Sequence, residues 1–359
     1  MNYTKQKNTI YRNLGEDLVN LLKTTNAILA GGAITSIFSG NEINDYDIYF
    51  RSKEDLIVFV RNLYCDEDNL EEDQFVDIGA YSFVCTSQTE RSITFGEPNN
   101  DKRKIQLIHF DYFDNATEIF DSYDFSINMG AYDFKHEEFV FSTDFLTDIA
   151  QRRLTFNAGT KYPIMSTLRV SKYVDRGYVI SKKEMFKIGL AVADLNITSW
   201  EELEDQLSGF YGVDVSAMFD RRQEFSIEAA IEMLDLVEEL PTNFDNSPPN
   251  LRQVLFNIEG NPYKNQVVFY KPVNRINRDD STGQSWTSPQ IWTLGVEQDV
   301  KHVDVYATEA EAIAYVNNHW RNGEVGVMVL MIERGSVTMG HYELEVSGIV
   351  RPFAFTIVN

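Results

Sequence analysis

The segment AILAGGAITSIFSGNEINDYDIYF, residues 27–50, constrains the fold of this chain more than any other. Its apolar start predicts a buried strand, which Gly31 and Gly32 end as they open a short helix. The run DYDIYF predicts the next strand. Because side chains alternate along a strand, Asp45 and Asp47 are expected on one face. The segment therefore predicts a strand–helix–strand unit with paired carboxylates on its second strand.

These residue types suit metal-assisted nucleotidyl transfer. Bare backbone at Gly31 and Gly32 lets a phosphate come close to a helix N-terminus. Paired carboxylates hold hard divalent cations, here Mg²⁺ or Mn²⁺. Such cations bridge nucleophile and triphosphate in an in-line displacement. The alternative is that Asp45 and Asp47 are ordinary polar residues at a strand end. Their mutual repulsion favours a shared cation.

Bulk properties narrow the class of protein. A length of 359 residues favours two or three domains. The chain has no apolar run long enough to span a membrane, and its first residues lack a signal-peptide core, so we expect a cytoplasmic protein. Cys65 and Cys85 provide neither a disulfide framework nor zinc spacing. The net charge of −23 disfavours a broad, non-specific nucleic-acid surface.

Hydrophobic periodicity predicts a mixed α+β chain. A helix is expected over residues 10–23, and further helices over 163–175, 182–193, 199–208 and 226–240. Strand patterns occur before the neck helices and again after residue 265. The predicted parts are a small mixed sheet with helices (1–125), a helical neck (126–240), a Pro- and Asn-rich linker (241–254) and a separate C-terminal α/β module (255–359).

Three ordered motifs carry a family resemblance. The first has the family form GGAVRDxxxGxxxxDxD and is matched by Gly31, Gly32, Ala33, Gly40, Asp45 and Asp47. The second, of the form RRDFTINALAYD, is matched by DSYDFSINMGAYD. The third is a basic helix that ends in an aromatic–glycine turn, LRVSKYVDRGYVI. Residues 27–190 thus resemble the DNA polymerase beta-type nucleotidyltransferases, most nearly the bacterial-type CCA-adding enzymes and poly(A) polymerases.

The resemblance implies a nucleotidyltransferase fold, a Mg²⁺ or Mn²⁺ site and an NTP pocket such as one for ATP. By this likeness Asp45 and Asp47 are the catalytic metal ligands, and Gly31 and Gly32 admit the triphosphate. Asp124 and Asn128 would contact the sugar of the nucleotide, with a capping Asp and a buried Asn as the alternative. Triphosphate or acceptor contacts are expected at Arg153 and Arg169, with solvated helix faces as the alternative.

The departures from the family are equally specific. The third catalytic carboxylate is expected on the strand KIQLIHF, where Gln106 stands and Asp111 lies just beyond. The family's base-reading Glu-Asp pair falls at Tyr162 and Pro163. CCA addition itself is therefore not implied. His109, near the missing carboxylate, is expected to be a hydrogen-bonded core or edge residue.

The combined prediction is a metal-dependent nucleotidyltransferase that moves a nucleoside monophosphate from an NTP to an acceptor hydroxyl and releases pyrophosphate. The acceptor is an RNA end, a protein or a small molecule. One alternative is a catalytically weak relative that binds a nucleotide or a partner. Another alternative is an ADP-ribosyltransferase-like activity in the C-terminal module. Without such an activity, this module is expected to bind a partner or to form an oligomer. The acidic composition and the departures from the family motifs would suit a phage protein.

Overall fold

The computed structural model describes most of the chain. The described residues are 3–63, 75–78, 81–89, 91–97, 100–207, 225–226, 228–230, 249–263, 265–273, 275–277, 282–284, 291–319, 325–340 and 343–358. The chain divides into two compact units, Met1–Val254 and Leu255–Asn359. The second unit begins at the residue where the sequence predicted the C-terminal module.

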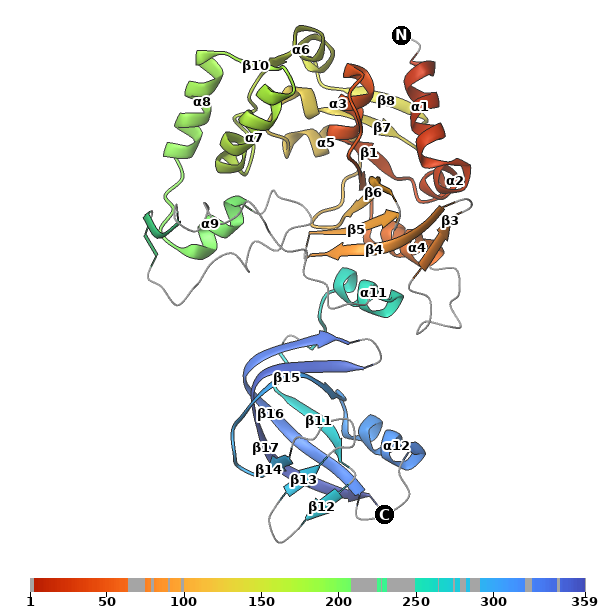
Figure 1. Ribbon diagram of the computed structural model, residues 1–359, viewed down its shortest axis with the longest axis vertical. Helices are drawn as coiled ribbons and strands as arrows, with labels where there is room; N and C mark the ends of the chain where they lie inside the picture. The colour runs from red at the N-terminus through yellow and green to blue at the C-terminus, as the bar shows by residue number, and fades with distance from the viewer. Residues whose placement is uncertain are drawn as a thin grey trace. The chain divides into compact units, whose positions relative to one another are not determined.

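Unit 1 is built on one mixed sheet (Figure 1). Its strand order is β3-β4-β5-β6-β2-β1-β7-β8, and β2–β6 is the one parallel pair among these strands. The bounds are β1 Ile28–Ala30, β2 Asp45–Tyr49, β3 Phe75–Ile78, β4 Tyr81–Gln88, β5 Ser92–Glu97, β6 Asn100–Ile108, β7 Gly130–Asp133 and β8 Glu138–Phe141. The predicted mixed α+β class is confirmed.

Helices surround this sheet and continue into the neck. Their bounds are α1 Thr4–Leu14, α2 Glu16–Thr24, α3 Gly32–Ser39, α4 Lys53–Leu63, α5 Ala116–Asp121, α6 Phe145–Gln151, α7 Pro163–Asp175, α8 Lys182–Ala193 and α9 Trp200–Leu207. A 3₁₀ turn covers Ser126–Asn128, and β9 (Arg153–Leu154) pairs with β10 (Val179–Ile180). None of the helices in the described ranges has the length and apolar character needed to cross a bilayer.

One helical expectation differs from the structure, and two others agree with it. The single helix predicted over residues 10–23 is wrong, because the chain forms α1 and α2 and breaks between them at Gly15. Gly15 has φ 84° and ψ 158°, a conformation outside the helical region that glycine adopts readily. In contrast, α7 and α8 have the predicted bounds. Pro163 occupies the first turn of α7, and the Ser181 hydroxyl caps α8 by accepting from the Glu184 N–H.

The first sheet extends past the predicted domain boundary at residue 125. Strands β7 and β8 lie within the predicted neck, yet β7 pairs with β1 along Ile28–Ala30. Helix α5 packs on these strands, since Ala116 and Ile119 share a buried cluster with Ile28 and Ala131. The boundary expected at residue 125 therefore cuts through the sheet and is corrected. Within the predicted linker, residues 241–248 lie outside the described part of the chain, and α11 (Leu251–Glu259) begins at Leu251.

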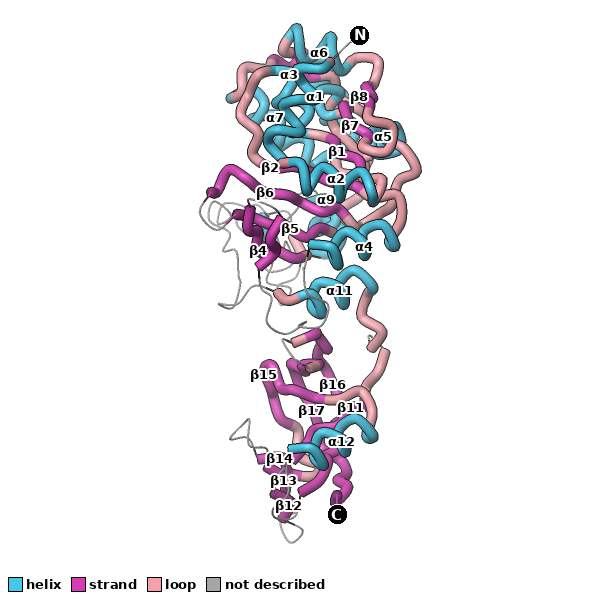
Figure 2. The backbone as a smooth tube through the Cα atoms, turned by 90° about the vertical axis from the view of Figure 1, so that its right-hand side faces the viewer, coloured by secondary structure: helices cyan, strands magenta, loops and turns pink. Residues whose placement is uncertain are grey.

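Unit 2 is mostly strand, and its described helical residues are the second half of α11 and α12 (Glu309–His319) (Figure 2). One sheet has the order β11-β16-β17-β15, with bounds Val268–Val273, Val325–Met339, Leu344–Val358 and Gln298–Val305. A bridge between Tyr270 and Tyr306 joins β11 to the end of β15. A second sheet holds β12 Arg275–Asn277, β13 Thr282–Gln284 and β14 Ile291–Thr293.

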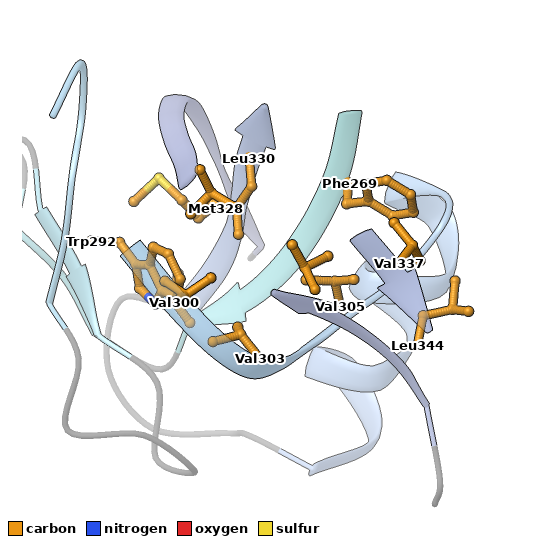
Figure 3. Close-up of a cluster of buried hydrophobic side chains, with 12 residues drawn as sticks. Phe269, Trp292, Val300, Val303, Val305, Met328, Leu330, Val337 and Leu344 are labelled. Atoms are coloured by element: carbon orange, nitrogen blue, oxygen red, sulfur yellow. The ribbon is translucent and has the colours of Figure 1, made fainter. Parts of the chain in front are cut away.

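The core of unit 2 consists of apolar side chains that the curved strands enclose (Figure 3). Trp292 from β14 is fully buried there. It belongs to the same buried cluster as Val300 and Met328 (Figure 3).

Candidate metal and nucleotide site

Strand β2 places two carboxylates on one face of the unit 1 sheet, as strand alternation predicts. Asp45 is exposed and Asp47 is half-buried, whereas Tyr46 and Ile48 are buried on the opposite face. The strand lies between β1 and β6, so Asp47 is held between Ala30 on one side and Gln106 on the other. Both carboxylates therefore project from a well-supported strand.

The carboxylate of Asp47 is not neutralised by a close partner. Its Oδ1 atom is buried and accepts no hydrogen bond within the described part of the protein. Burial raises the pKa of Asp47 well above its usual range, and the charge of Asp45 raises it further. The cations of Arg169 and Lys172 act in the opposite direction but do not cancel this effect. The arrangement therefore favours binding of a proton or a metal cation.

The glycine pair lies beside these carboxylates. Gly31 caps α3 with φ 80°, and a Cβ on this residue would lie 2.8 Å from the Tyr123 hydroxyl oxygen and 3.5 Å from Asp47 Oδ2. Gly32 opens the helix, and a Cβ there would meet no atom within 4 Å. Bare backbone thus brings the N-terminus of α3 next to Asp47, where its dipole favours an anion.

The second and third motifs meet in one buried network. Asp124 is 2% exposed and accepts a hydrogen bond from Arg169 Nη1 at 3.2 Å. Asn128 Nδ2 donates to Asp124 Oδ1 at 3.3 Å and to the Tyr173 hydroxyl at 2.8 Å. Asp124 precedes the 3₁₀ turn that contains Asn128, so this short turn brings the two side chains together. Arg169 links this network electrostatically to Asp47.

Arg153 is placed differently from Arg169. Its guanidinium pairs with Asp148 at 2.6 Å, and Asp148 is fully buried. Asp148 also accepts a hydrogen bond of 2.5 Å from the Ser126 hydroxyl. These contacts give Arg153 a structural partner, and its predicted contact with a nucleotide remains a prediction.

The position of the missing third carboxylate is occupied by a buried amide. Gln106 on β6 lies opposite Asp47 in the parallel register, and its Nε2 donates to Thr94 Oγ1 at 3.2 Å. Asp111 lies beyond Ile108, where β6 ends, and its carboxylate accepts from the backbone N–H of Tyr112. No group of three or more His, Cys, Asp or Glu able to hold a metal occurs in the residues described above. Any cation here would rely on Asp45 and Asp47.

Tyr162 and His109, which the sequence analysis singled out, both form hydrogen bonds within the protein. The Tyr162 hydroxyl, at the place of the family's base-reading pair, accepts from Arg91 Nη1 at 2.5 Å. Arg91 also pairs with Asp205 of α9 at 3.0 Å. His109 Nε2 lies 3.1 Å from the Thr89 carbonyl, and burial lowers the pKa of the imidazole. His109 is thus the hydrogen-bonded residue that the sequence predicted.

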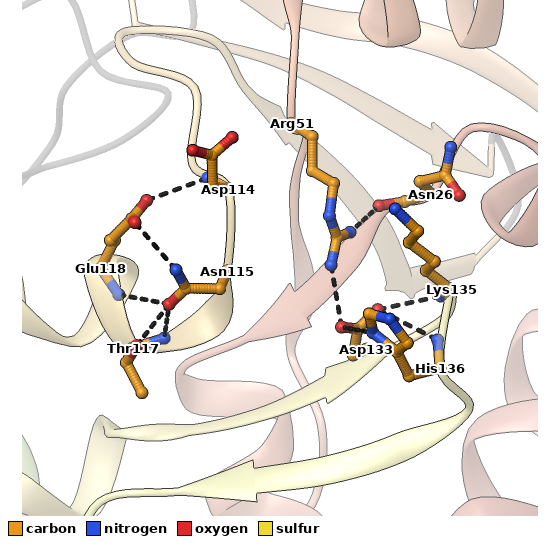
Figure 4. A network of polar contacts seen from close by, with 9 residues as sticks. All are labelled: Asn26, Arg51, Asp114, Asn115, Thr117, Glu118, Asp133, Lys135 and His136. Carbon is orange, nitrogen blue, oxygen red and sulfur yellow. Dashed lines mark hydrogen bonds and ion pairs between the residues drawn. The ribbon is translucent and has the colours of Figure 1, made fainter.

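Asp133, the last residue of the second motif, anchors a network away from the carboxylates (Figure 4). Its carboxylate accepts from Arg51 Nη2 at 2.8 Å and pairs with His136 at 2.7 Å. Arg51 also donates to the Asn26 carbonyl. Burial opposes ionisation of Asp133, but the His136 and Arg51 contacts outweigh it and lower its pKa. This network joins the ends of β2 and β7, so Asp133 has a structural role.

Sequence reasoning missed two residues near the carboxylates. Lys104 lies opposite Asp45 in the β2–β6 register and is exposed. Tyr123 donates to the Tyr49 hydroxyl at 3.0 Å, with its oxygen against Gly31. Lys104 lies two residues before Gln106, so strand alternation gave a signal for it. Tyr123 gave no such signal, because only the packing of α5 brings it to β1.

Comparisons with known proteins found similarity in sequence to one group of proteins and similarity in structure to another. Residues 2–152 match the family described as Gabija anti-defense 2 family protein. The chain is 41% identical over 254 residues to the protein Gabija anti-defense 2 of Bacillus phage SPbetaL7, which covers 70% of this chain and 58% of that protein. The match therefore spans less than two thirds of the relative's length. The motifs alone did not indicate this anti-defense family.

Solved structures similar to this chain are CCA-adding enzymes. The Thermotoga maritima enzyme complexed with tRNA has a TM-score of 0.39 and 12% identity, over 66% of this chain and 54% of that one. The Bacillus stearothermophilus enzyme in complex with CTP has a TM-score of 0.33 and 16% identity, over 58% and 49%. In sequence, the chain is similar to a phage anti-defense protein.

Proposed function

We propose that this chain is a metal-dependent nucleotidyltransferase whose site is the Asp45–Asp47 face of β2. One observation carries the proposal: a buried, unpartnered carboxylate oxygen of Asp47 lies beside a second carboxylate and a side-chain-free helix N-terminus. Retaining an ionisable group with such a raised pKa costs stability, so its presence favours a functional role.

The donor set fits Mg²⁺ or Mn²⁺ when a nucleotide is also bound. Mg²⁺ is commonly held by one or two carboxylates together with substrate phosphates, and it does not need an all-protein cage. Asp45 and Asp47 would supply the carboxylates, and the triphosphate would supply the remaining anionic oxygens. When bound, the cation neutralises charge on the phosphates during displacement.

The chain's own residues would position the substrates. The N-terminus of α3 at Gly31 and Gly32 would bind the triphosphate through backbone N–H groups. Arg169, Asp124 and Asn128 would orient the sugar and phosphates. The acceptor hydroxyl oxygen would form a bond to the α-phosphorus as the bond from that phosphorus to the bridging oxygen breaks. Pyrophosphate would leave with that oxygen, and the hydroxyl proton would pass to solvent.

We further propose that the biological role of this activity is to counter a Gabija defence. The 41% identity to the phage protein of that name supports this role. An RNA end, a protein hydroxyl and a small molecule all remain in the proposal as acceptors.

A second candidate is a nucleotide-binding protein that does not transfer. The buried Gln106 at the third carboxylate position favours it, because an amide cannot neutralise a second cation. The proposed ADP-ribosyltransferase-like activity depends on the segment 267–295, where residues 274, 278–281 and 285–290 lie outside the described part. Partner binding or oligomerisation through unit 2 also stays a prediction.

The test is a transfer assay with each α-labelled NTP, Mn²⁺ or Mg²⁺, and an extract of the bacterial host. Label on RNA, protein or a small molecule that is lost in Asp45→Ala and in Asp47→Asn supports transfer. Metal-dependent NTP binding with no label transferred supports the second candidate. Asp114→Asn, an exposed carboxylate outside the site, is the matched control. Plating a Gabija-sensitive phage on cells that carry Gabija and each variant tests whether the anti-defense role needs the same carboxylates.

A further inference from the structure

A cavity of ≈ 570 Å³ lies in unit 1 apart from the carboxylate face. Its lining residues come from α1, α3, the segment after α3 and β2. Helices α1 and α3 lie side by side (Figures 1 and 2). Tyr46 lines it, and Tyr46 points to the opposite face of β2 from Asp45 and Asp47. Its lining comprises Lys5, Thr9, Arg12, Asn13, Ser36, Ile37, Gly40, Asn41, Glu42, Ile43 and Tyr46. The cavity is therefore separate from the proposed nucleotidyl-transfer site.

Two cations in this lining have no acidic partner. Lys5 and Arg12 are both exposed, and neither side chain forms an ion pair or a hydrogen bond with any described residue. By contrast, Lys7 of α1 and Lys23 of the neighbouring α2 both pair with Glu137, at 3.5 and 2.5 Å. In a chain with 55 acidic and 32 basic residues, two unpaired cations on one cavity wall are unexpected.

Their spacing sets the size of an anion that could use both. Lys5 and Arg12 are seven residues apart on α1, which places them on one helix face about 10 Å apart along the axis. Thr9 lies between them, and Asn13 and Asn41 add amide groups to the lining. Ile37, on the wall from α3, adds apolar surface.

We propose that this cavity binds a phosphorylated small molecule of about nucleotide size. Cavities of roughly 300–1,000 Å³ hold ligands of that size. Arginine binds phosphate through two parallel N–H groups, and lysine adds a second positive charge. A ligand with phosphates at one end and a ring at the other matches cations on α1 and apolar side chains on α3 and β2. This site goes beyond the proposed transfer reaction and does not depend on it.

The test is isothermal titration with ADP in metal-free buffer that contains EDTA, since the transfer site needs a cation to hold phosphates. The wild-type chain is expected to bind ADP, and the double variant Lys5→Gln/Arg12→Gln to bind at least tenfold more weakly. The charge-matched control Lys182→Gln/Lys183→Gln, on exposed residues of α8, should bind as the wild type does. Ile37→Trp, which fills the cavity without changing its charge, should weaken binding in the same way.

Three outcomes overturn the inference. They are no ADP binding by the wild type, equal affinity in the Lys5→Gln/Arg12→Gln and wild-type chains, and loss of binding in Asp47→Asn with Lys5 and Arg12 intact. The last outcome would place the ligand at the carboxylate face of β2. Circular dichroism of each variant shows whether weakened binding reflects a loss of fold, and the two independent variants keep the test decisive if one of them unfolds. Failure of nucleotidyl transfer leaves this binding result unaffected.

Discussion

Gln106 on β6 lies directly opposite Asp47 on β2, and its side-chain amide donates to Thr94 Oγ1 rather than to the carboxylates. Partners in a parallel register point to the same face, so Gln106 shares the face of Asp45 and Asp47. The candidate site thus has two carboxylates and a neutral third position. The proposed site therefore offers two carboxylate ligands to a cation, whereas a site with an acidic residue at position 106 would offer three.

Gln106→Glu should create a third carboxylate and increase the response to metal. Without metal, the added buried charge should lower stability by about 1–3 kcal/mol. Saturating Mn²⁺ should recover that loss, because binding to the folded state alone stabilises it. The measurement is the change in Tm on adding Mn²⁺, with Gln106→Leu as the control that loses the Thr94 hydrogen bond without gaining charge. Equal Mn²⁺ shifts in both variants would show that position 106 does not face the cation.

Asp47→Asn should stabilise the metal-free protein at neutral pH. The folded-state pKa of Asp47 is raised, so the folded protein holds this proton more tightly than the unfolded chain does. The contribution of Asp47 to the stability of the wild-type protein is therefore largest below the ordinary Asp pKa of about 4. This contribution is lost as the pH rises through the raised pKa of Asp47 in the folded protein. In EDTA, the Tm of the variant should therefore exceed that of the wild type by a margin that grows with pH. We expect the margin to reach about 2–4 °C, which corresponds to a difference of roughly 1 kcal/mol in the free energy of unfolding. A Tm difference that stays constant from pH 4 to 8 would contradict it.

Gly31→Ala should destabilise unit 1, while Gly32→Ala should not. At Gly31 the φ of 80° disfavours any Cβ, and the new methyl would lie 2.8 Å from the Tyr123 hydroxyl. We expect a loss of about 1–3 kcal/mol. Gly32→Ala meets nothing within 4 Å and should be neutral or slightly stabilising. Urea unfolding measures both, and the double variant Gly31→Ala/Tyr123→Phe should recover part of the loss by removing the crowded hydroxyl.

Arg169→Met and Arg153→Met should have similar effects on stability and different effects on nucleotide binding. Each removes the ion-pair partner of a buried aspartate, Asp124 or Asp148. Because both arginines are partly exposed, we expect a loss of about 2–3 kcal/mol in each. Of these two arginines, only Arg169 acts electrostatically on Asp47, so Arg169→Met rather than Arg153→Met should weaken Mn²⁺–NTP binding, by about tenfold. Equal weakening in Arg153→Met would support its predicted contact with the nucleotide.

Local sequence patterns were sufficient for much of the fold. Strand alternation alone put Asp45 and Asp47 on one face, and the glycine pair marked the turn into α3. The bounds of α7 followed from Pro163 in its first turn and the helical spacing after it. These features depend on residues a few positions apart, so the sequence determines them directly.

Tertiary structure decided the rest. The pairing of β2 with β6 put Gln106 opposite Asp47, and the pairing of β7 with β1 carried the first sheet past residue 125. Tertiary packing also paired Arg169 with Asp124 and Arg153 with Asp148, although the sequence predicted the same kind of contact for both arginines. Strand register and ion-pair choice depend on segments distant in the chain that pack to bury apolar surface, and local periodicity contains no record of which segments meet.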